Sequence, residues 1–274
     1  MRFVVLGSGT SVPDPARGPA GFLVQVGDRA WLVDGGSGTL QRCMAAGVDP
    51  RRLDGGFYSH HHPDHCADLV PLLFAMRVGP APRVGDYPIV AGEGFRRFFE
   101  GLQGVYGKWI RPGDNRVIIE ELPLDRASVV ERGDLRVHAR PARHSAGALH
   151  LRFEADGRSV VFSGDTAPSD ELVTLARGAD LLVCECAGSD GAPIPGHMAP
   201  SEVAALVASA QPAEVWLTHL YPHVDPDEAL GIVAATGVPV RHAYDGLAYV
   251  SPSQSADSTE RASTSAPTTS SKVG

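Results

Sequence analysis

The apolar and polar positions of this chain divide it into an early part made of strands and a later part in which strands and helices alternate. Near the N-terminus, the apolar run at residues 3–6 ends in a glycine turn, and the runs at 22–26 and 31–33 flank the pair Gly27-Asp28. Two apolar runs on either side of a short glycine-containing turn are the signal of a β-hairpin. The early part is therefore predicted to consist of strands joined by tight turns.

In the later part, short apolar runs are followed by segments with helical periodicity. The predicted strands are residues 135–139, 159–163, 181–184 and 215–218. Helices are predicted at residues 40–46, ended by Gly47, and at residues 170–177. A helix that starts near residue 67 has the apolar face Leu69, Leu72, Leu73 and Met76. Two more are marked by their starts, one at residues 201–210 with Ser201 as N-cap and one opened by Asp225-Pro226. Early hairpins and later strand–helix alternation together predict an α/β fold with two stacked sheets and helices outside.

Residues 251–274 differ from the rest of the chain in composition. Half of them are serine or threonine, and they show no apolar periodicity. Such a segment buries too little surface to offset the entropy lost on ordering. We therefore expect one folded domain over residues 1–250 and a disordered Ser/Thr-rich tail over residues 251–274.

The overall composition is that of a globular domain with an acidic surface. The 274 residues are 43% apolar and 20% charged, and the formal net charge is -8. Because excess negative charge repels nucleic acid and anionic lipid, nucleic acid is disfavoured as a partner and no membrane association is expected. The four cysteines form no C-x-x-C pair, and neither a secretory leader nor a membrane span is evident. These features indicate a cytoplasmic protein.

A cluster of histidines at residues 59–65, S-H-H-H-P-D-H, is the strongest sign of chemistry in the chain. If its first residues are extended, His60 and His62 share one face, because side chains alternate along a strand. The proline that follows bends the chain, so Asp64 and His65 can converge on the same region. Packing offers no reason for such an array, which therefore predicts a metal site.

Three or four ligands from one loop leave the coordination of a metal incomplete, so further ligands are expected downstream. His144 follows the strand at 135–139, Asp165 closes V-V-F-S-G-D-T, and His219 closes W-L-T-H-L. The C-terminal end of a buried strand is a place where a rigid sheet presents a functional side chain to a loop-lined cleft. These three residues are therefore candidate metal ligands.

With these motifs in order, the chain resembles the metallo-β-lactamase-fold hydrolases and, among them, the ribonuclease Z-like branch. The five motifs are W-L-V-D-G-G with Asp34, S-H-H-H-P-D-H, the segment around His144, S-G-D-T with Asp165, and L-T-H with His219. The N-terminal L-G-S-G-T-S-V-P is typical of that branch, and the resemblance covers nearly all of residues 1–250. It implies an αββα sandwich with metals at one edge of the sheets.

The resemblance also implies ligands for two divalent ions. One ion is expected on His60, His62 and His144, the second on Asp64, His65 and His219, and Asp165 is expected to bridge them. Nitrogen and carboxylate ligands around an open position suit Zn²⁺ best, although Mn²⁺ or Fe tolerate a similar set. Asp165 stands where antibiotic-cleaving relatives usually have cysteine, which disfavours β-lactam hydrolysis. Asp34 is expected either to orient the histidine loop by hydrogen bonds or simply to cap a turn.

Two residues are candidates for catalysis. Asp64 is expected to orient an attacking hydroxide as well as to bind metal. His197 lies in G-H-M-A-P-S-E, where ribonuclease Z-like proteins carry a histidine that protonates the leaving oxygen or holds the phosphate. The family reads H-S-T or similar there, so this chain departs from the pattern, and a histidine satisfied by backbone near a helix start is the alternative. His223 is expected near the mouth of the cleft, and incidental positions are expected for the remaining histidines, His61, His138, His150 and His242.

The expected reaction is hydrolysis by a hydroxide that bridges the two ions, because two cations lower the pKa of a shared water towards roughly 7. A small or cyclic phosphodiester is favoured as the substrate. Bacterial ribonuclease Z inserts a tRNA-binding arm between the positions of His144 and Asp165, where this chain has only a hairpin turning at Asp156-Gly157. Processing of tRNA 3′ ends is therefore disfavoured. Hydrolysis of an acyl substrate, a thioester or a lactone, on the same metals is the other alternative.

Residues 92–112 form an insertion between the histidine loop and His144. It contains basic and aromatic side chains, namely Arg96, Arg97, Lys108, Trp109 and Arg111. We favour a surface amphipathic helix for this segment; the alternative is a lid that contacts phosphate or a base. A non-enzymatic binding module is disfavoured, because no expected ligand is missing. A homodimer is compatible with the family, but the sequence marks no interface.

Overall fold

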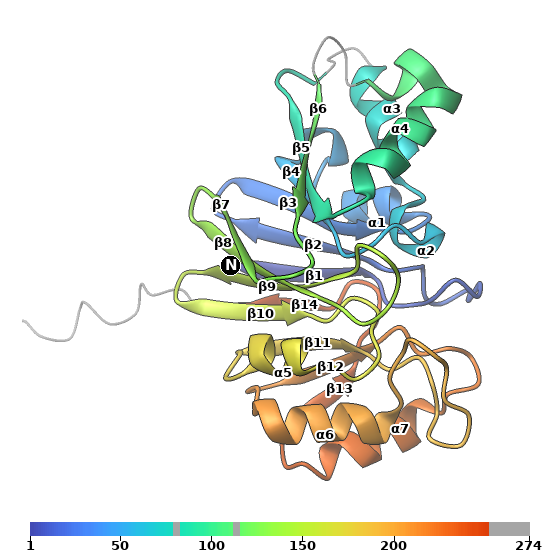
Figure 1. The fold of residues 1–274 in the computed structure, drawn as a ribbon, viewed down its shortest axis with the longest axis vertical. Coiled ribbons are helices and arrows are strands. Elements are labelled where there is room, and N and C mark those ends of the chain that lie inside the picture. The colour runs from blue at the N-terminus through green and yellow to red at the C-terminus, as the bar shows by residue number, and fades with distance from the viewer. Residues whose placement is uncertain (79–82, 112–115, 252–274) are drawn as a thin grey trace, which may run out of the picture.

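The computed structural model describes residues 1–78, 83–111 and 116–251, which form two seven-stranded sheets stacked face to face with helices on both outer sides (Figure 1). The first sheet has the order β14-β1-β2-β3-β4-β5-β6 and the second β13-β12-β11-β10-β9-β8-β7. This is the αββα sandwich that was predicted. The tail predicted to be disordered lies outside the described residues, apart from Ser251.

The strands of the first sheet are β1 (Arg2–Gly7), β2 (Gly21–Val26), β3 (Arg29–Gly35), β4 (Gly55–Tyr58), β5 (Tyr87–Gly92), β6 (Val117–Leu122) and β14 (Ala248–Val250). Those of the second are β7 (Ser128–Arg132), β8 (Leu135–Pro141), β9 (Leu149–Ala155), β10 (Arg158–Phe162), β11 (Leu181–Glu185), β12 (Val215–Thr218) and β13 (Val240–His242). Each sheet is antiparallel on one side and parallel on the other: β3 to β6 run parallel in the first, and β10 to β13 in the second.

Helices cover the outer faces (Figure 1). On the first sheet they are α1 (Thr39–Ala45), α2 (Pro63–Cys66), α3 (Leu69–Arg77) and α4 (Phe95–Tyr106), with the 3₁₀ turns η1 (Pro50–Arg52) and η2 (Gly107–Ile110). On the second sheet they are α5 (Asp170–Ala176), α6 (Pro200–Ala210) and α7 (Pro226–Ala234). Among the described residues, no helix has both the length and the apolar character needed to cross a membrane.

Strands in the middle of the sandwich are apolar on both faces, because each face is covered. Phe3 and Val5 of β1 point into the core between the sheets, whereas Val4 and Leu6 pack under the helices. Phe3 also stacks on Phe22 of β2, with ring centroids 5.6 Å apart. The continuous apolar runs read from the sequence are therefore strands buried on two sides.

Both predicted hairpins are present. Gly27, between β2 and β3, has a φ of 56°. At the β9–β10 turn, Asp156 and Gly157 have φ values of 55° and 69°. Positive φ at both central residues is typical of the two-residue turn that matches the twist of a hairpin. The span between His144 and Asp165 is thus a short hairpin.

Two helix starts differ from the prediction. The helix expected from near residue 67 is α3, which begins at Leu69 after the separate short helix α2. Its predicted apolar face is buried throughout. Ser201 is not the N-cap of α6, since Ala199 holds that position. The proline after Ala199 has the φ of a first helical residue, so the helix begins there. Glu202 accepts a hydrogen bond from the backbone N–H of Ala199 at 2.9 Å. Asp225 caps α7 as expected.

Most of the insertion at residues 92–112 is an amphipathic surface helix, the favoured alternative. Phe95 and Phe99 of α4 are buried against the first sheet, while Arg96 and Arg97 are exposed. Pro112 lies outside the described residues. Whether α4 also acts as a lid stays a prediction.

His150, expected to be incidental, is a fully buried residue that links the second sheet to α5. It lies on β9, where its Nδ1 donates to the carbonyl oxygen of Ser163 at 2.6 Å and its Nε2 lies 3.1 Å from the hydroxyl of Ser169, the N-cap of α5. Burial lowers the pKa of His150 to about 4. The histidine is therefore held neutral in the folded protein at neutral pH.

This burial predicts a loss of stability in mild acid. The unfolded chain binds a proton at His150 near pH 6.5 and the folded protein only near pH 4, so unfolding takes up a proton between these values and stability falls as the pH falls. We expect His150 to account for up to about 3 kcal/mol of the loss in the free energy of unfolding between pH 7 and pH 4. Urea denaturation of the parent and of His150→Gln at both pH values measures this. An equally steep pH dependence in the variant would contradict it.

Candidate metal centre

All the predicted ligands lie at one edge of the sandwich. Residues 60–65 form the loop after β4 and the start of α2, His144 lies in the loop between β8 and β9, Asp165 follows β10, and His219 follows β12 (Figure 1). Strands that run parallel end at the same edge of a sheet, which is where α/β sandwiches place their ligands. Residues up to 159 positions apart are thereby gathered in one place.

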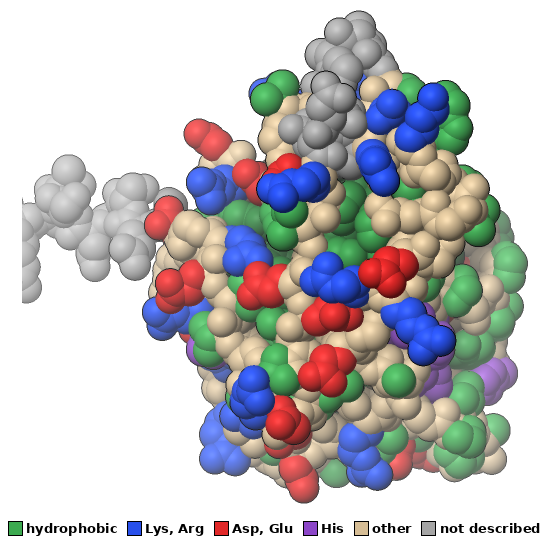
Figure 2. All heavy atoms as spheres, turned by 45° about the horizontal axis from the view of Figure 1, so that its top comes forward, with side chains coloured by type: hydrophobic (Ala, Val, Ile, Leu, Met, Phe, Trp, Pro, Cys, Tyr) green, Lys and Arg blue, Asp and Glu red, His purple; other side chains and the backbone are tan. Residues whose placement is uncertain are grey.

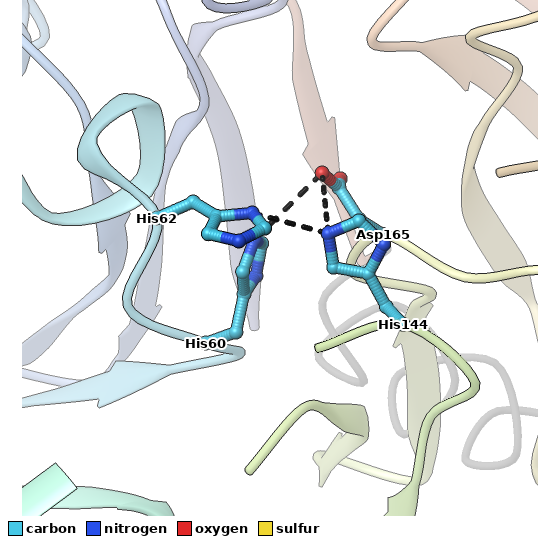
Figure 3. Close-up of side chains that lie close together, drawn as sticks. All are labelled: His60, His62, His144 and Asp165. Carbon is cyan, nitrogen blue, oxygen red and sulfur yellow. Dashed lines mark hydrogen bonds and ion pairs between the residues drawn. The ribbon is translucent and has the colours of Figure 1, made fainter. Parts of the chain in front are cut away.

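The first group consists of His60, His62, His144 and Asp165. One ligand atom from each lies within 4.8 Å of the others. Figure 3 shows the histidines of the loop on one side and His144 and Asp165 on the other, with their polar atoms facing one another. The Nδ1 of His62 and the Nε2 of His144 are 3.1 Å apart, and the Nε2 of His144 is 3.8 Å from Oδ2 of Asp165.

The second group consists of Asp64, His65 and His219, whose ligand atoms also lie within 4.8 Å of one another. The Nε2 of His219 lies 3.3 Å from Oδ2 of Asp64. Oδ2 of Asp165 lies 3.3 Å from the Nε2 of His65 and 3.6 Å from that of His219. Asp165 thus borders both groups, at the position expected of a bridging carboxylate. The arrangement is consistent with a dinuclear metal centre.

The residues fit metal ions by their chemistry. The Nε2 atoms of His60 and His65 are buried and have no hydrogen-bond partner in the protein. A buried polar atom without a partner is costly, by about 1–3 kcal/mol, so such atoms indicate a missing ligand. Two atoms bound tetrahedrally to one zinc ion lie about 3.4 Å apart, since each bond is roughly 2.0–2.2 Å long. The separations of 3.1–3.8 Å found here are of that size.

In His65 and His144 the nitrogen that faces away from the centre is hydrogen-bonded to the protein, which fixes the nitrogen that faces the centre. The Nδ1 of His65 donates to Oδ2 of Asp34 at 2.8 Å. The two carboxylate oxygens of Asp34 also accept hydrogen bonds from the backbone N–H and the hydroxyl of Ser59, both at 2.7 Å. The Nδ1 of His144 donates to the carbonyl oxygen of Gly196 at 2.9 Å. Asp34 thus lies behind the predicted ligand His65 and is hydrogen-bonded to the histidine loop, which fits the first of its two predicted roles.

Strained backbone occurs at this edge. Asp34 and His219 have φ values of 53° and 57°, in the left-handed region that residues other than glycine seldom adopt. Such strain persists only where the surrounding structure enforces it, often at functional sites. Close packing enforces the loop position as well, because a Cβ at Gly36 would overlap the carbonyl oxygen of Asp64.

Asp165 is a buried negative charge among the imidazoles of the centre. Burial by itself raises the pKa of a carboxyl, but the imidazoles of His219, His65 and His60 hold the pKa of Asp165 well below its usual range. Burial and the neighbouring His65 ring lower the pKa of His60 well below its usual value. An ionised Asp165 and a neutral His60 are the forms that bind metal. For His65, burial alone would lower the pKa, but the carboxyls of Asp165 and Asp34 raise it well above its usual value, so a metal ion would have to displace its proton.

His197 stands beside both groups, and the sequence did not reveal what holds it there. Its ring lies 4.8 Å from that of His144 and 5.6 Å from that of His219. Its Nδ1 donates to Oε1 of Glu185 at 2.9 Å. Burial would lower the pKa of His197, but the hydrogen bond and charge of Glu185 outweigh this effect and raise it. His197 is therefore bonded to a buried carboxylate, and not to backbone as in the alternative reading.

Glu185 is the residue that the sequence analysis missed. It ends β11, is 1% exposed, and accepts further hydrogen bonds from the backbone N–H groups of Thr166 and Ala187 at 2.8 and 3.0 Å. A glutamate at the C-terminal end of the buried run L-L-V-C-E was a signal that could have been used. The flanking thiols, Cys184 and Cys186, are buried and free.

The other histidines lie outside the centre. His61 stacks on Phe98 of α4, with centroids 5.2 Å apart. His138 faces Glu154 at 3.1 Å, and His242 faces Arg17 at 3.3 Å. His223, predicted near the mouth, lies on the loop after His219.

Comparisons of the chain with known proteins by family model, by sequence and by structure agree with one another. Residues 29–220 match the family model described as a beta-lactamase superfamily domain. The chain is 31% identical over 262 residues to ribonuclease Z of Mycobacterium bovis, covering 86% of this chain and 92% of the relative. The crystal structure of the metallo-beta-lactamase fold protein YhfI from Bacillus subtilis superposes with a TM-score of 0.78 at 26% identity, covering 90% of this chain and 98% of that one. Human short-form tRNase Z superposes with a TM-score of 0.74 at 20% identity, covering 92% and 100%.

Proposed function

The chain belongs to the metallo-β-lactamase superfamily and is a metal-dependent hydrolase of that fold, and we propose that it is a phosphodiesterase acting on a small or cyclic phosphodiester. The observation that carries this proposal is the pair His197–Glu185 beside the two ligand groups. A histidine whose pKa is raised by a buried carboxylate can supply the proton that an alkoxide leaving group needs. The likeness to ribonuclease Z, a nuclease, favours phosphorus over carbon as the centre attacked.

Two features favour a small substrate over tRNA. The span between His144 and Asp165 is occupied by the β9–β10 hairpin, which leaves no room for an arm. On the face drawn in Figure 2, acidic side chains lie among the basic ones over much of the surface, and the net charge of the chain is -8. Binding of a polynucleotide depends on neutralising many phosphates, which such a surface supports poorly.

The proposed roles follow from the positions of the side chains. His60, His62 and His144 would hold one ion, Asp64, His65 and His219 the other, and Asp165 both; the donor set favours Zn²⁺. When bound, two divalent ions lower the pKa of water and offset negative charge on a phosphate.

The chain's own residues then orient the reaction. Asp64, which reaches the centre beside His219, holds the attacking water by accepting a hydrogen bond. His197 donates a proton from Nε2 to the leaving oxygen, since its Nδ1 is bonded to Glu185. Glu185 stabilises the imidazolium that makes this possible.

Metal analysis followed by a substrate panel tests the proposal. We expect purified protein to carry about two divalent ions per chain and to hydrolyse bis(p-nitrophenyl) phosphate and 2′,3′-cyclic nucleotides, with loss of both metal and activity after chelation. The same panel includes a thioester, a lactone and a precursor tRNA transcript, with chelated protein as the control.

The acyl substrates and the precursor tRNA each test one alternative function. Turnover of the thioester or lactone without turnover of any phosphodiester would replace the proposal by acyl hydrolysis. Cleavage of the precursor tRNA at rates above those for every small phosphodiester would replace it by tRNA processing.

A further inference from the structure

Tyr221 is an aromatic residue beside the metal centre to which nothing above assigns a role. It lies two residues after His219, on the loop that follows β12. Its ring centroid is 5.8 Å from that of His219 and 6.3 Å from that of His197, and its plane is turned by 73° and 70° from theirs. The ring packs partly against the core beneath α6 and α7 and is half-buried.

The side chain of Tyr221 is held in place both at its ring and at its hydroxyl. Its ring is anchored in the core, and its hydroxyl lies 3.0 Å from the hydroxyl of Ser11, at an exposed point of the loop after β1. That loop is itself tied to the strand end, because Ser8 accepts a hydrogen bond from the backbone N–H of His219 at 3.0 Å. A tyrosine has only two side-chain torsions, so a ring held in this way presents a flat surface at little entropic cost.

The proposed function gives the ring a place relative to the leaving group, because Tyr221 lies beside His197. Under the proposed function, His197 protonates the leaving oxygen, so the remainder of the leaving group must lie beyond His197. The spacing of 6.3 Å between the rings of His197 and Tyr221 is within the 4.5–7 Å range of aromatic contacts. The exposed ring of His223 lies 6.2 Å from Tyr221 and extends the aromatic wall outwards.

We propose that Tyr221 is a specificity-determining residue that contacts the leaving group, and that it selects phosphodiesters whose leaving group carries a flat ring, as a nucleoside does. The inference rests on the proposed function for the direction of departure. Stacking of one base on one aromatic side chain is worth roughly tenfold to a hundredfold in affinity, so the selectivity is expected to be of that size.

Two matched substrates test this inference. Adenosine 2′,3′-cyclic phosphate and glycerol 1,2-cyclic phosphate share the same five-membered cyclic phosphodiester, but only the first carries a base. We expect the parent protein to favour the adenosine compound in kcat/KM. In Tyr221→Leu the ratio of the two kcat/KM values should fall roughly tenfold or more, mainly through the KM of the adenosine compound. Tyr221→Phe, which keeps the ring and loses the bond to Ser11, should retain most of the ratio.

Tyr106→Leu is the matched control, because Tyr106 is an exposed tyrosine at the end of α4. Metal content is measured for every variant. An unchanged ratio in Tyr221→Leu overturns the inference, and so does an equal loss in Tyr221→Phe, which would assign the effect to the hydroxyl. Equal losses for both substrates would indicate a structural role and would overturn it as well.

The failure of this inference can be told apart from failure of the proposed function. If neither cyclic phosphodiester is turned over, the proposed function fails, and calorimetric binding of adenosine 3′-monophosphate and glycerol 1-phosphate to metal-loaded protein takes the place of kinetics. A preference for the adenosine compound that Tyr221→Leu abolishes supports the subsite, whereas equal binding of both compounds overturns it.

Discussion

Replacing Asp165 with alanine is expected to reduce bound metal to less than one ion per chain and to lower kcat/KM for any substrate by on the order of a thousandfold or more. The reason is its place between the two ligand groups, since Oδ2 of Asp165 lies 3.3–3.8 Å from ring nitrogens of His60, His65, His144 and His219. Without it, imidazoles converge on a site with less negative charge to balance two cations. Metal ions contribute several kcal/mol to such reactions, which corresponds to factors of that size.

Metal analysis of dialysed protein and steady-state kinetics measure the two effects together. Asp165→Asn keeps the shape of the side chain and removes its charge, so it should fall close to the alanine variant. Asp134→Ala, at the exposed β7–β8 turn, serves as the control and should retain metal and activity. Full metal content and activity in Asp165→Ala would show that the two groups are not joined by this carboxylate.

Replacing His197 with alanine is expected to lower kcat by roughly a hundredfold to ten-thousandfold for a substrate with an alkoxide leaving group, such as a 2′,3′-cyclic nucleotide. The loss should be far smaller for bis(p-nitrophenyl) phosphate, because p-nitrophenolate leaves as a stable anion and needs no proton. Metal content should stay at the parent level, since all seven predicted ligands belong to two groups that do not include His197; His197 completes only a third group, with Asp165 and His219.

The variant Glu185→Gln tests the contribution of the carboxylate to the His197–Glu185 pair. The amide can still accept the hydrogen bond from His197 but no longer carries the charge that raises the pKa of the imidazole. We expect an intermediate loss with the same dependence on the leaving group. His138→Ala, on β8 and bonded to Glu154, is the matched control. A loss of the same size for both leaving groups in His197→Ala would rule out proton donation and point to phosphate binding or to metal binding by His197.

The local pattern of the chain was enough to predict its layers and most of its elements. Apolar runs separated by glycine turns marked the hairpins, and the spacing of Leu69, Leu72, Leu73 and Met76 marked the buried face of α3. Errors arose where a neighbour in sequence changed the outcome. Ser201 has the side chain of an N-cap, but the fixed φ of the preceding proline begins α6 one residue earlier.

The seven proposed ligands could be identified from the sequence for a related reason. Each is a histidine or aspartate in a motif whose chemistry is local, either the histidine loop itself or the end of an apolar strand. Because the strands that precede these residues, β4, β8, β10 and β12, end at one edge, placing a residue at the end of one of them was nearly enough to place it at the centre.

By itself, the sequence determined the sandwich, the edge that carries chemistry, and the histidines and aspartates gathered there, because apolar periodicity and ligand chemistry are properties of short segments. Only the tertiary structure decided which nitrogen of each ring faces the centre, that Glu185 holds His197, and that Ser11 fixes Tyr221 beside them. Those contacts join residues 12 to 210 positions apart, and such pairings depend on how the loops pack after the sheets have formed.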